Sequence, residues 1–491
     1  MSAQHGQGTT IHSVTKAGTN ALHGDAFEFV RNDRFDARPY FSFRRPSLKR
    51  KQFGGTLGGP IVKNKLFFFG GYQRTTLRQE PVNRVAFVPT PAMLAGNFTA
   101  VASAACNAGR PINLAAPFAN NRIDPTLYSK AALNIASKLP LPGDPCGAIV
   151  YGSRNIANDG QGVGAIDYQW SDKHSLFGRY VATTSESPDP FTLTPGNILT
   201  AGLGSDSLTQ AFTVGDTYRI GPDMVNAFHL AVNRVAVSRT GARLFGPADV
   251  GINAYSYVPK ALALSVTGGF GLASGTDSTF RTTTYQTSDD VSLFRGTHEM
   301  SFGTNIAQSR SNTNLISAPG FVFNGSNTGL GMADFFLGRP AIFTAASPNA
   351  LYMRQWNVGL YGQDTWKLTP RLTMNYGVRW EPFLPQVSAN GRVYNFDIDR
   401  FRQGIKSTVF KNAPAGFYYP GDPGFPGKSG INKQWLNFGP RLGLAWDVQG
   451  DGRTSVRAFY GLSYDYLPLQ WRIGAGRAAP WVIPFAVSNP P

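Results

Sequence analysis

Histidine and cysteine are the residues of this 491-residue chain best able to bind a metal or act in catalysis. The six histidines are scattered through the sequence: His5, His12, His23, His174, His229 and His298. No HExxH, GxSxG or CxxC motif occurs, so neither a zinc-hydrolase nor a nucleophile-elbow site is indicated. His174 and His298 fall in short turns, where the ordinary expectation is a solvated side chain. The sequence therefore predicts a protein that is not an enzyme.

Two further segments resemble ligand-binding motifs in part. DVQGDG at 447–452 has the start of a calcium loop but lacks the other oxygen ligands and the closing glutamate. A tight hairpin turn accounts for the same residues. GGFGLASG at 268–275 approaches a dinucleotide fingerprint without its strand–turn–helix context. We expect no cofactor and no metal.

The two cysteines, Cys106 and Cys146, lie within one long predicted loop. In an exported protein such a loop is in an oxidising environment, which favours a disulfide between them. Two free thiols are the alternative. The loop contains no histidine, so a metal site there is disfavoured.

Aromatic side chains in the predicted loops could stack on a sugar or a peptide. These candidate ligand contacts are Tyr40, Phe41, Phe43, Phe321, Phe323, Phe417, Tyr418 and Tyr419. The alternative for each is that it packs one loop against another.

Residues 355–381 show most clearly which elements must carry these loops. Their side chains alternate between apolar and polar along two arms joined by Thr369-Pro370. One parity carries Trp356, Val358, Leu360, Trp366 and Leu368, then Leu372, Met374, Tyr376, Val378 and Trp380. Asp364 is the one exception on that parity. A period of two in a tight hairpin indicates antiparallel strands, and this length and pattern are typical of a transmembrane β-barrel.

Aromatic rings near the strand ends are predicted to lie at the lipid interface, where an amphipathic ring is favoured. The candidates are Trp356, Trp366, Trp380, Trp446, Tyr464 and Tyr466.

The rest of the chain repeats this arrangement. Hairpins with short turns alternate with long connections at 77–163, 185–206, 239–280, 312–353 and 383–434. The first connection contains a predicted short helix near 125–139. Short turns on one rim and long loops on the other are typical of bacterial outer-membrane barrels. We therefore expect an all-β, antiparallel barrel with about thirteen long strands, long extracellular loops and short periplasmic turns.

Composition agrees with an envelope protein. Hydrophobic residues make up 42% and aromatic residues 13%, which excludes a disordered chain. No apolar run approaches a transmembrane helix in length, and the start lacks the apolar core of a signal peptide. The net charge of +17 suits a membrane surface rich in phosphate. The main basic cluster (Arg44, Arg45, Lys49, Arg50 and Lys51) lacks the interleaved aromatics of a nucleic-acid groove, so outer-membrane lipid is the predicted partner.

Several segments resemble TonB-dependent outer-membrane receptors, in particular the Oar-like group. HSVTKAGTNALHGDAFEFVRNDRFDAR and QFGGTLGGPIVKNKLFFFGGYQ resemble the join between plug and barrel. DYQWSDKHSLFGRY, GLYGQDTWKLTPRLTMNYGVRWE and NFGPRLGLAWDV resemble later barrel hairpins, and NRIDPTLYSKAALNIASKLPLP a long extracellular loop. The resemblance implies a plugged barrel of about 22 strands, energised through the inner-membrane TonB complex.

On this basis residues 1–20 correspond to the end of the plug and 21–491 to a partial barrel, with roughly nine strands missing downstream. The expected function is energised uptake or binding of a bulky ligand such as an oligosaccharide, peptide or siderophore. The alternatives are a plugless porin, an adhesion-type barrel or a secreted all-β binding module. For the chain by itself we expect an open sheet whose unpaired edges are the strands at 22–32 and 453–466.

Overall fold

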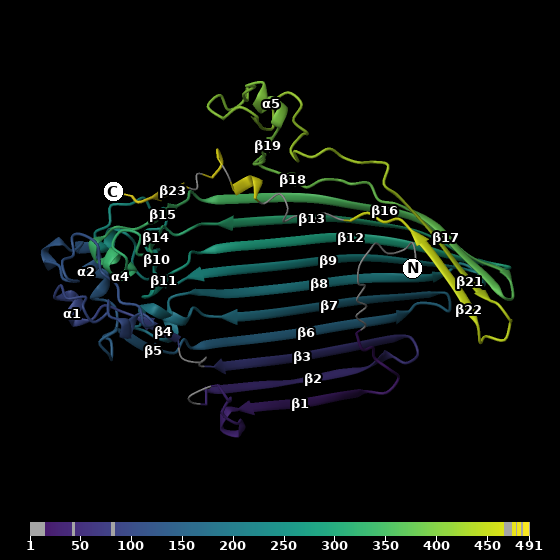
Figure 1. Ribbon diagram of the computed structural model, residues 1–491. Helices are drawn as coiled ribbons and strands as arrows, with labels where there is room; N and C mark the ends of the chain where they lie inside the picture. The colour runs from purple at the N-terminus through teal and green to yellow at the C-terminus, as the bar shows by residue number, and fades with distance from the viewer. Residues whose placement is uncertain are drawn as a thin grey trace.

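One antiparallel sheet of 14 strands dominates the computed structural model, which describes residues 15–41, 45–79, 84–465, 474–477, 479–482 and 485–490. Thirteen strands follow one another in the order β1-β2-β3-β6-β7-β8-β9-β12-β13-β16-β17-β21-β22, and β18 pairs with β16 (Figure 1). Their bounds are β1 His23–Asn32, β2 Leu48–Val62, β3 Leu66–Gln79, β6 Asn155–Gln169, β7 His174–Ser187, β8 Leu203–Arg219, β9 Met224–Gly241, β12 Ser278–Arg295, β13 His298–Leu315, β16 Asn349–Thr369, β17 Leu372–Trp380, β18 Val387–Ser388, β21 Phe438–Asp447 and β22 Ser455–Gly461.

The sheet is open, with β1 and β22 as its two edges. Each of these strands pairs with a single neighbour, β2 and β21 respectively. The predictions of about thirteen long strands and of these two edges are confirmed. The last strand is shorter than the predicted span of 453–466.

The two faces of the sheet differ in chemistry, as a period of two requires. On the predicted apolar parity Trp356, Leu360 and Val378 remain 47%, 44% and 46% exposed. A soluble sandwich would bury these side chains in its core, so the alternative of a secreted sandwich module is wrong. We call this the lipid-facing side of the sheet.

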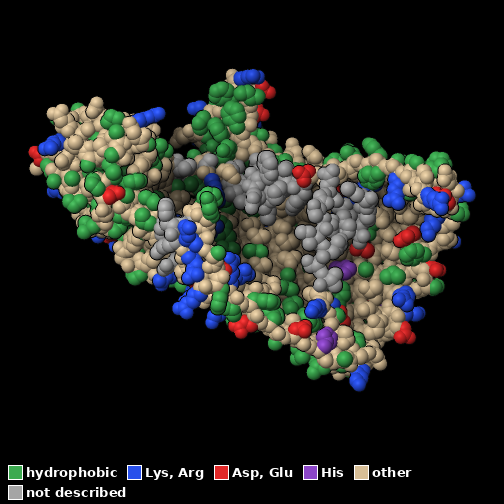
Figure 2. Space-filling model, turned by 60° about the horizontal axis from the view of Figure 1, so that its bottom comes forward, with side chains coloured by type: hydrophobic (Ala, Val, Ile, Leu, Met, Phe, Trp, Pro, Cys, Tyr) green, Lys and Arg blue, Asp and Glu red, His purple; other side chains and the backbone are tan. Residues whose placement is uncertain are grey.

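The opposite side, facing the lumen, carries small polar side chains. They hydrogen-bond to one another across neighbouring strands, as between Thr284 and Ser309 (3.1 Å) and between Thr365 and Asn375 (2.6 Å). Figure 2 shows a hollowed face of the molecule whose surface is largely neither apolar nor charged. Apolar residues outside and polar residues inside are the pattern of an outer-membrane barrel wall.

The long loops form a body of their own, here called the cap, at the end of the sheet opposite the short turns (Figure 1). It contains a sheet in the order β11-β10-β14-β15-β23 and the pair β4-β5. The strands are β4 Arg84–Phe87, β5 Ala148–Tyr151, β10 Ala263–Val266, β11 Gly271–Ala273, β14 Gly320–Phe323, β15 Ile342–Ala345 and β23 Phe485–Ser488. The α-helices here are α1 Pro91–Leu94, α2 Lys130–Ala136, α3 Pro190–Leu193 and α4 Gly331–Leu337. Phe98, Phe335 and Phe336 form the centre of its apolar core.

Short 3₁₀ turns complete the loops, at Asp33–Phe35, Ala104–Cys106, Pro125–Leu127, Ile198–Thr200, Ala248–Val250 and Ala475–Arg477. The helix predicted near 125–139 is present as Pro125–Leu127 followed by α2. Among the described residues no helix has the length and apolar character needed to span a membrane.

The connection at 383–434 forms a separate lobe, drawn above the sheet in Figure 1. It contains α5 Ile398–Arg402 and the short pair β19 Asn395–Phe396 and β20 Phe417–Tyr418. The Asp422 carboxylate accepts hydrogen bonds from the Ser407 hydroxyl (2.6 Å), the Thr408 hydroxyl (2.8 Å) and the Tyr419 N–H (2.9 Å). This buried carboxylate holds the two arms of the lobe together.

Candidate functional site

Aromatic side chains on the lipid-facing side line up across neighbouring strands. Cross-strand pairing places Tyr180 opposite Phe212 and brings Tyr285 and Trp356 to the same level. We call Tyr180, Phe212, Tyr285 and Trp356 the outer aromatic row. Trp366 follows Trp356 ten positions along β16, which is about 33 Å along a strand and about 25 Å in height at the usual barrel tilt. This spacing matches the apolar band of an outer-membrane barrel.

The other interface candidates share this face where they are described. Trp380 pairs with Leu360, and Trp446 with Leu372, so both lie on the parity of Trp356. The indole N–H of Trp380 donates to the Trp435 carbonyl. Tyr464 follows β22 and is half-buried, and Tyr466 lies outside the described residues. Their role at the lipid interface stays a prediction.

Asp364, the exception to the apolar pattern, is buried in a polar cluster at the short-turn rim. Its carboxylate lies 2.6 Å from Nδ1 of His298 and accepts a hydrogen bond from the Tyr376 hydroxyl (2.7 Å). The His298 ring stacks on Trp366, with 5.1 Å between centroids. Side chains from two neighbouring strands, β13 and β17, thus contact one oxygen, Oδ2, of this buried carboxylate on β16, whereas its Oδ1 has no hydrogen-bond partner among the described residues.

The same arrangement recurs on β7 and β8. His174 stacks on Tyr218 at 3.9 Å and lies 3.4 Å from Asp216. The His174 and His298 side chains are 33% and 35% exposed, so each is partly solvated while it also contacts the neighbouring strand. In both places a histidine begins one strand and an Asp-Thr-aromatic triplet lies on the next strand of the sheet. The triplets are DTY at 216–218 and DTW at 364–366.

Charged groups on the lumen side gather on β12, β16 and β17. The Tyr361 hydroxyl donates to Asp290 (2.6 Å), and Arg379 pairs with Glu381 (2.7 Å). Tyr361 and Arg379 are buried. These contacts therefore hold β12, β16 and β17 together on the lumen side.

The loop aromatics predicted to contact ligand fall into three settings. Phe321 and Phe323 are buried in the cap core, where packing accounts for them. They also line an apolar cleft of about 600 Å³ with Ile135, Phe335 and Phe343.

In the 383–434 lobe, Tyr419 is buried against Phe410 and Trp481, whereas Phe417 and Tyr418 are half-buried. Tyr40 and Phe41 are almost fully exposed in the β1–β2 connection. Contact with a ligand stays a prediction for all of these residues.

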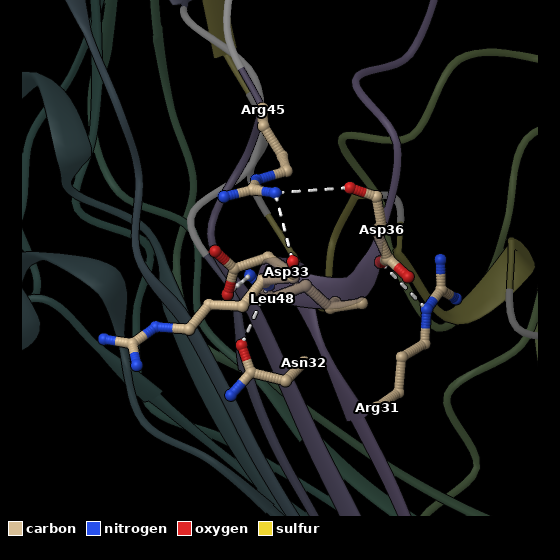
Figure 3. Close-up of polar contacts among 7 residues, drawn as sticks. Arg31, Asn32, Asp33, Asp36, Arg45 and Leu48 are labelled. Carbon is tan, nitrogen blue, oxygen red and sulfur yellow. Dashed lines mark hydrogen bonds and ion pairs between the residues drawn. The ribbon is translucent and has the colours of Figure 1, made fainter.

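The base of the β1–β2 connection is held by polar contacts (Figure 3). Asn32 accepts a hydrogen bond from the N–H two residues later (3.0 Å), and Asp33 accepts one from the Leu48 N–H (3.2 Å). Arg31 and Asp36 form an ion pair at 3.1 Å. These contacts fix the loop that presents Tyr40 and Phe41. Phe43 and Arg44 lie outside the described residues.

Cys106 and Cys146 form a disulfide that closes a 40-residue separation within the cap. The pairing favoured by the sequence is therefore present. Nearby, burial raises the pKa of Tyr128 to about 12, and its hydroxyl donates to the Met93 carbonyl (2.6 Å). Among the described residues no group of three or more His, Cys, Asp or Glu side chains is arranged to hold a metal.

A family model described as an outer membrane beta barrel domain matches residues 14–491. The chain belongs to this family. The outer-membrane β-barrel of this chain thus lies in the cell outer membrane, with its apolar side toward lipid.

Individual relatives cover this outer-membrane barrel less completely. The TonB-dependent transporter Oar of Myxococcus xanthus is 32% identical over 81 residues, 15% of this chain and 8% of Oar. The outer membrane transporter YddB of Escherichia coli aligns over 84% of this chain and 38% of its own, with 9% identity and a TM-score of 0.41. A ferric enterobactin receptor of Pseudomonas aeruginosa aligns over 93% and 46%, with 12% identity and a TM-score of 0.41. The chain spans less than half the length of each of these proteins.

Proposed function

We propose that this chain is part of an Oar-like TonB-dependent transporter, with residues 1–20 from the end of a plug domain and 21–491 from the barrel. The membership in the outer-membrane barrel family and the short match to Oar support this assignment. The order of the plug-join and hairpin motifs along the sequence supports it independently.

The open sheet carries the proposal that further strands complete the barrel. The edges β1 and β22 expose backbone N–H and C=O groups along one side. In a lipid environment each unsatisfied group costs several kcal/mol, and closure is the way in which barrels remove such edges. A larger closed barrel with a plug would satisfy both strands.

The cap and the lumen wall are the proposed ligand path. The bulky ligand, an oligosaccharide, a peptide or a siderophore, would first meet the cap and the exposed Tyr40 and Phe41 of the β1–β2 connection, and then the polar lumen side of the sheet. Binding and gated passage are the proposed chemistry, with no bond-making step. The TonB complex would supply the energy through the part of the protein upstream of the barrel.

An immunoblot of the source bacterium with an antibody raised against the cap tests the fragment proposal. We expect an outer-membrane band well above the 53.1 kDa of this chain. A band at that mass would overturn the proposal. Sequencing the flanking DNA should correspondingly show in-frame coding for a plug and a TonB-interacting segment upstream and for more strands downstream.

A plugless porin or adhesion-type barrel is the remaining alternative, and it is supported by the polar lumen side alone. Conductance of the protein, purified from the outer membrane and inserted in a planar bilayer, distinguishes a porin from a plugged transporter. A plugged transporter should show no steady open channel, whereas a porin should conduct continuously. An adhesion-type barrel should conduct nothing and should be insensitive to loss of the TonB complex in an uptake assay.

A further inference from the structure

We propose that the lipid-facing side carries a binding site for the phosphate groups of an outer-leaflet lipid. The site consists of Arg234, Arg281, Arg310 and Arg354, from the adjacent strands β9, β12, β13 and β16. We call these four residues the arginine group. The proposal concerns the lipid around the barrel and is independent of the transported ligand.

Strand register places the arginine group directly beside the outer aromatic row. Residues two positions apart on a strand point to the same face. Moving two positions from the outer aromatic row toward the long loops therefore stays on the lipid-facing side. Arg234 pairs with Thr283, Thr283 with Arg310, and Arg310 with Arg354, so they form one continuous row. Arg281 lies one step further toward the loops, diagonal to Arg234 and Arg310. Diagonal cross-strand neighbours lie about 7–8 Å apart, and Arg234 and Arg354, three strand spacings apart, lie about 14 Å apart. The four guanidinium groups can therefore line up along a headgroup that carries more than one phosphate.

The arginine group lies at the height along the strands where lipid headgroups are expected. Toward the short turns the same face carries Tyr285 and Trp356, then the apolar band that includes Leu360. Long loops of outer-membrane barrels face the exterior, so the arginine group lies at the outer-leaflet interface. Arginine side chains can extend their stems over apolar surface there and keep the charge in the polar layer.

The positive charges of the arginine group repel one another, which favours the binding of an anion between them. Arg310 and Arg354 are direct cross-strand partners, an arrangement that is destabilising unless a counter-charge intervenes. Within the described part of the chain, no carboxylate forms an ion pair with any member of the arginine group.

The side chains of the arginine group are held in place by contacts with uncharged protein groups. Arg310 donates to the Gln308 side chain (2.8 Å) and lies over the Tyr285 ring at 5.3 Å. Arg354 donates to Asn312 (2.9 Å). Each guanidinium has five N–H donors, so donors remain for a phosphate.

Phosphate is the favoured anion because its oxygens match the planar fork of a guanidinium. A row of arginines at membrane level next to aromatic anchors therefore fits a phosphorylated lipid headgroup. Lysine would supply the charge but not the paired hydrogen bonds.

The test uses the protein purified from its outer membrane in a neutral detergent, with bound lipid measured by native mass spectrometry. The probes are diphosphoryl lipid A and the same lipid after enzymatic removal of its phosphates. We expect tight binding of the phosphorylated probe only, and a loss of about thirty-fold in affinity for R310Q/R354Q. R295Q/K367Q, which removes the same charge at the short-turn rim, should bind like the unchanged protein.

R310K/R354K keeps the charge but not the paired hydrogen bonds, so it should lose affinity by less than R310Q/R354Q, and R281Q replaces the double variant if that one fails to insert. Equal binding of the dephosphorylated probe, equal loss in the Lys and Gln variants, or unchanged binding in R310Q/R354Q would each overturn the proposal. Complete displacement of lipid A by excess inorganic phosphate would show that the site takes free phosphate, and would overturn the lipid assignment.

Discussion

Replacing Phe336 by alanine should unfold the cap without unfolding the barrel wall. Phe336 is 0% exposed. Its ring contacts Tyr128 at 4.7 Å and Phe98 at 5.6 Å, so it joins α4 to two segments of the disulfide-bonded loop. A buried Phe→Ala change costs about 3–5 kcal/mol, because the transfer of the ring and the cavity left behind both count. The barrel strands make none of these ring contacts.

Hydrogen exchange with mass spectrometry on the detergent-folded protein measures this effect. Amides such as Val88 N–H, which donates to the Gly147 carbonyl (2.8 Å), should exchange on the order of a hundred to several thousand times faster. Amides of β8 and β9 should keep their protection. Phe401→Ala, at an exposed ring of the 383–434 lobe, is the matched control and should leave cap exchange within a few-fold. Equal loss of protection in cap and barrel would refute the view that the cap is a separate cooperative unit.

Three further outcomes are expected. C106S/C146S should destabilise the cap by about 4 kcal/mol, from the chain entropy of a 40-residue separation, with cap-specific faster exchange as the readout and a uniform change across the sheet as the contrary result. Burial alone would raise the pKa of Asp422, but hydrogen bonds from Ser407, Thr408 and the Tyr419 N–H outweigh it and lower the pKa to about 2 from an ordinary 3.8. The lobe should therefore keep its full stability above about pH 4 and lose about 2 kcal/mol as the pH falls toward 2; D422N should abolish this dependence in exchange measurements on 405–422, and an unchanged profile would contradict the assignment. Leu360→Arg, midway along the lipid-facing side of β16, should cost about 2–4 kcal/mol in folding into lipid vesicles, whereas Asn357→Arg on the lumen side should cost far less, and equal costs would mean that the faces are assigned wrongly.

The wall of the barrel could be predicted from the sequence because its information is local. The alternation from Trp356 to Trp380 determines strand, register and face together, since a slip by one residue would turn every side chain to the wrong side. The two edges of the sheet were predicted differently, from the first and last strands of the series having no further strand to pair with. Asp364 broke the pattern because its partners, His298 and Tyr376, come from other strands.

The cap could not be predicted because its contacts join loops that are distant in sequence. Phe98 meets Phe336 edge to face, yet no local period links them. The signal available was composition: GMADFFL at Gly331–Leu337 is too apolar for a solvated loop. The candidate ligand residues Phe321 and Phe323 were therefore placed correctly in a long loop, but their burial depended on partners that only the folded cap supplies.

The cap also dictates an order of events during biogenesis. Its core residues come from the connections after β3, β7, β9 and β13, so they meet only when those strands have paired. Contacts between such distant segments form late, because long loops must close first. Phe98 and Phe336 are among the residues that such closure must bring together. We therefore expect the cap core to be among the last parts of the protein to become protected during folding.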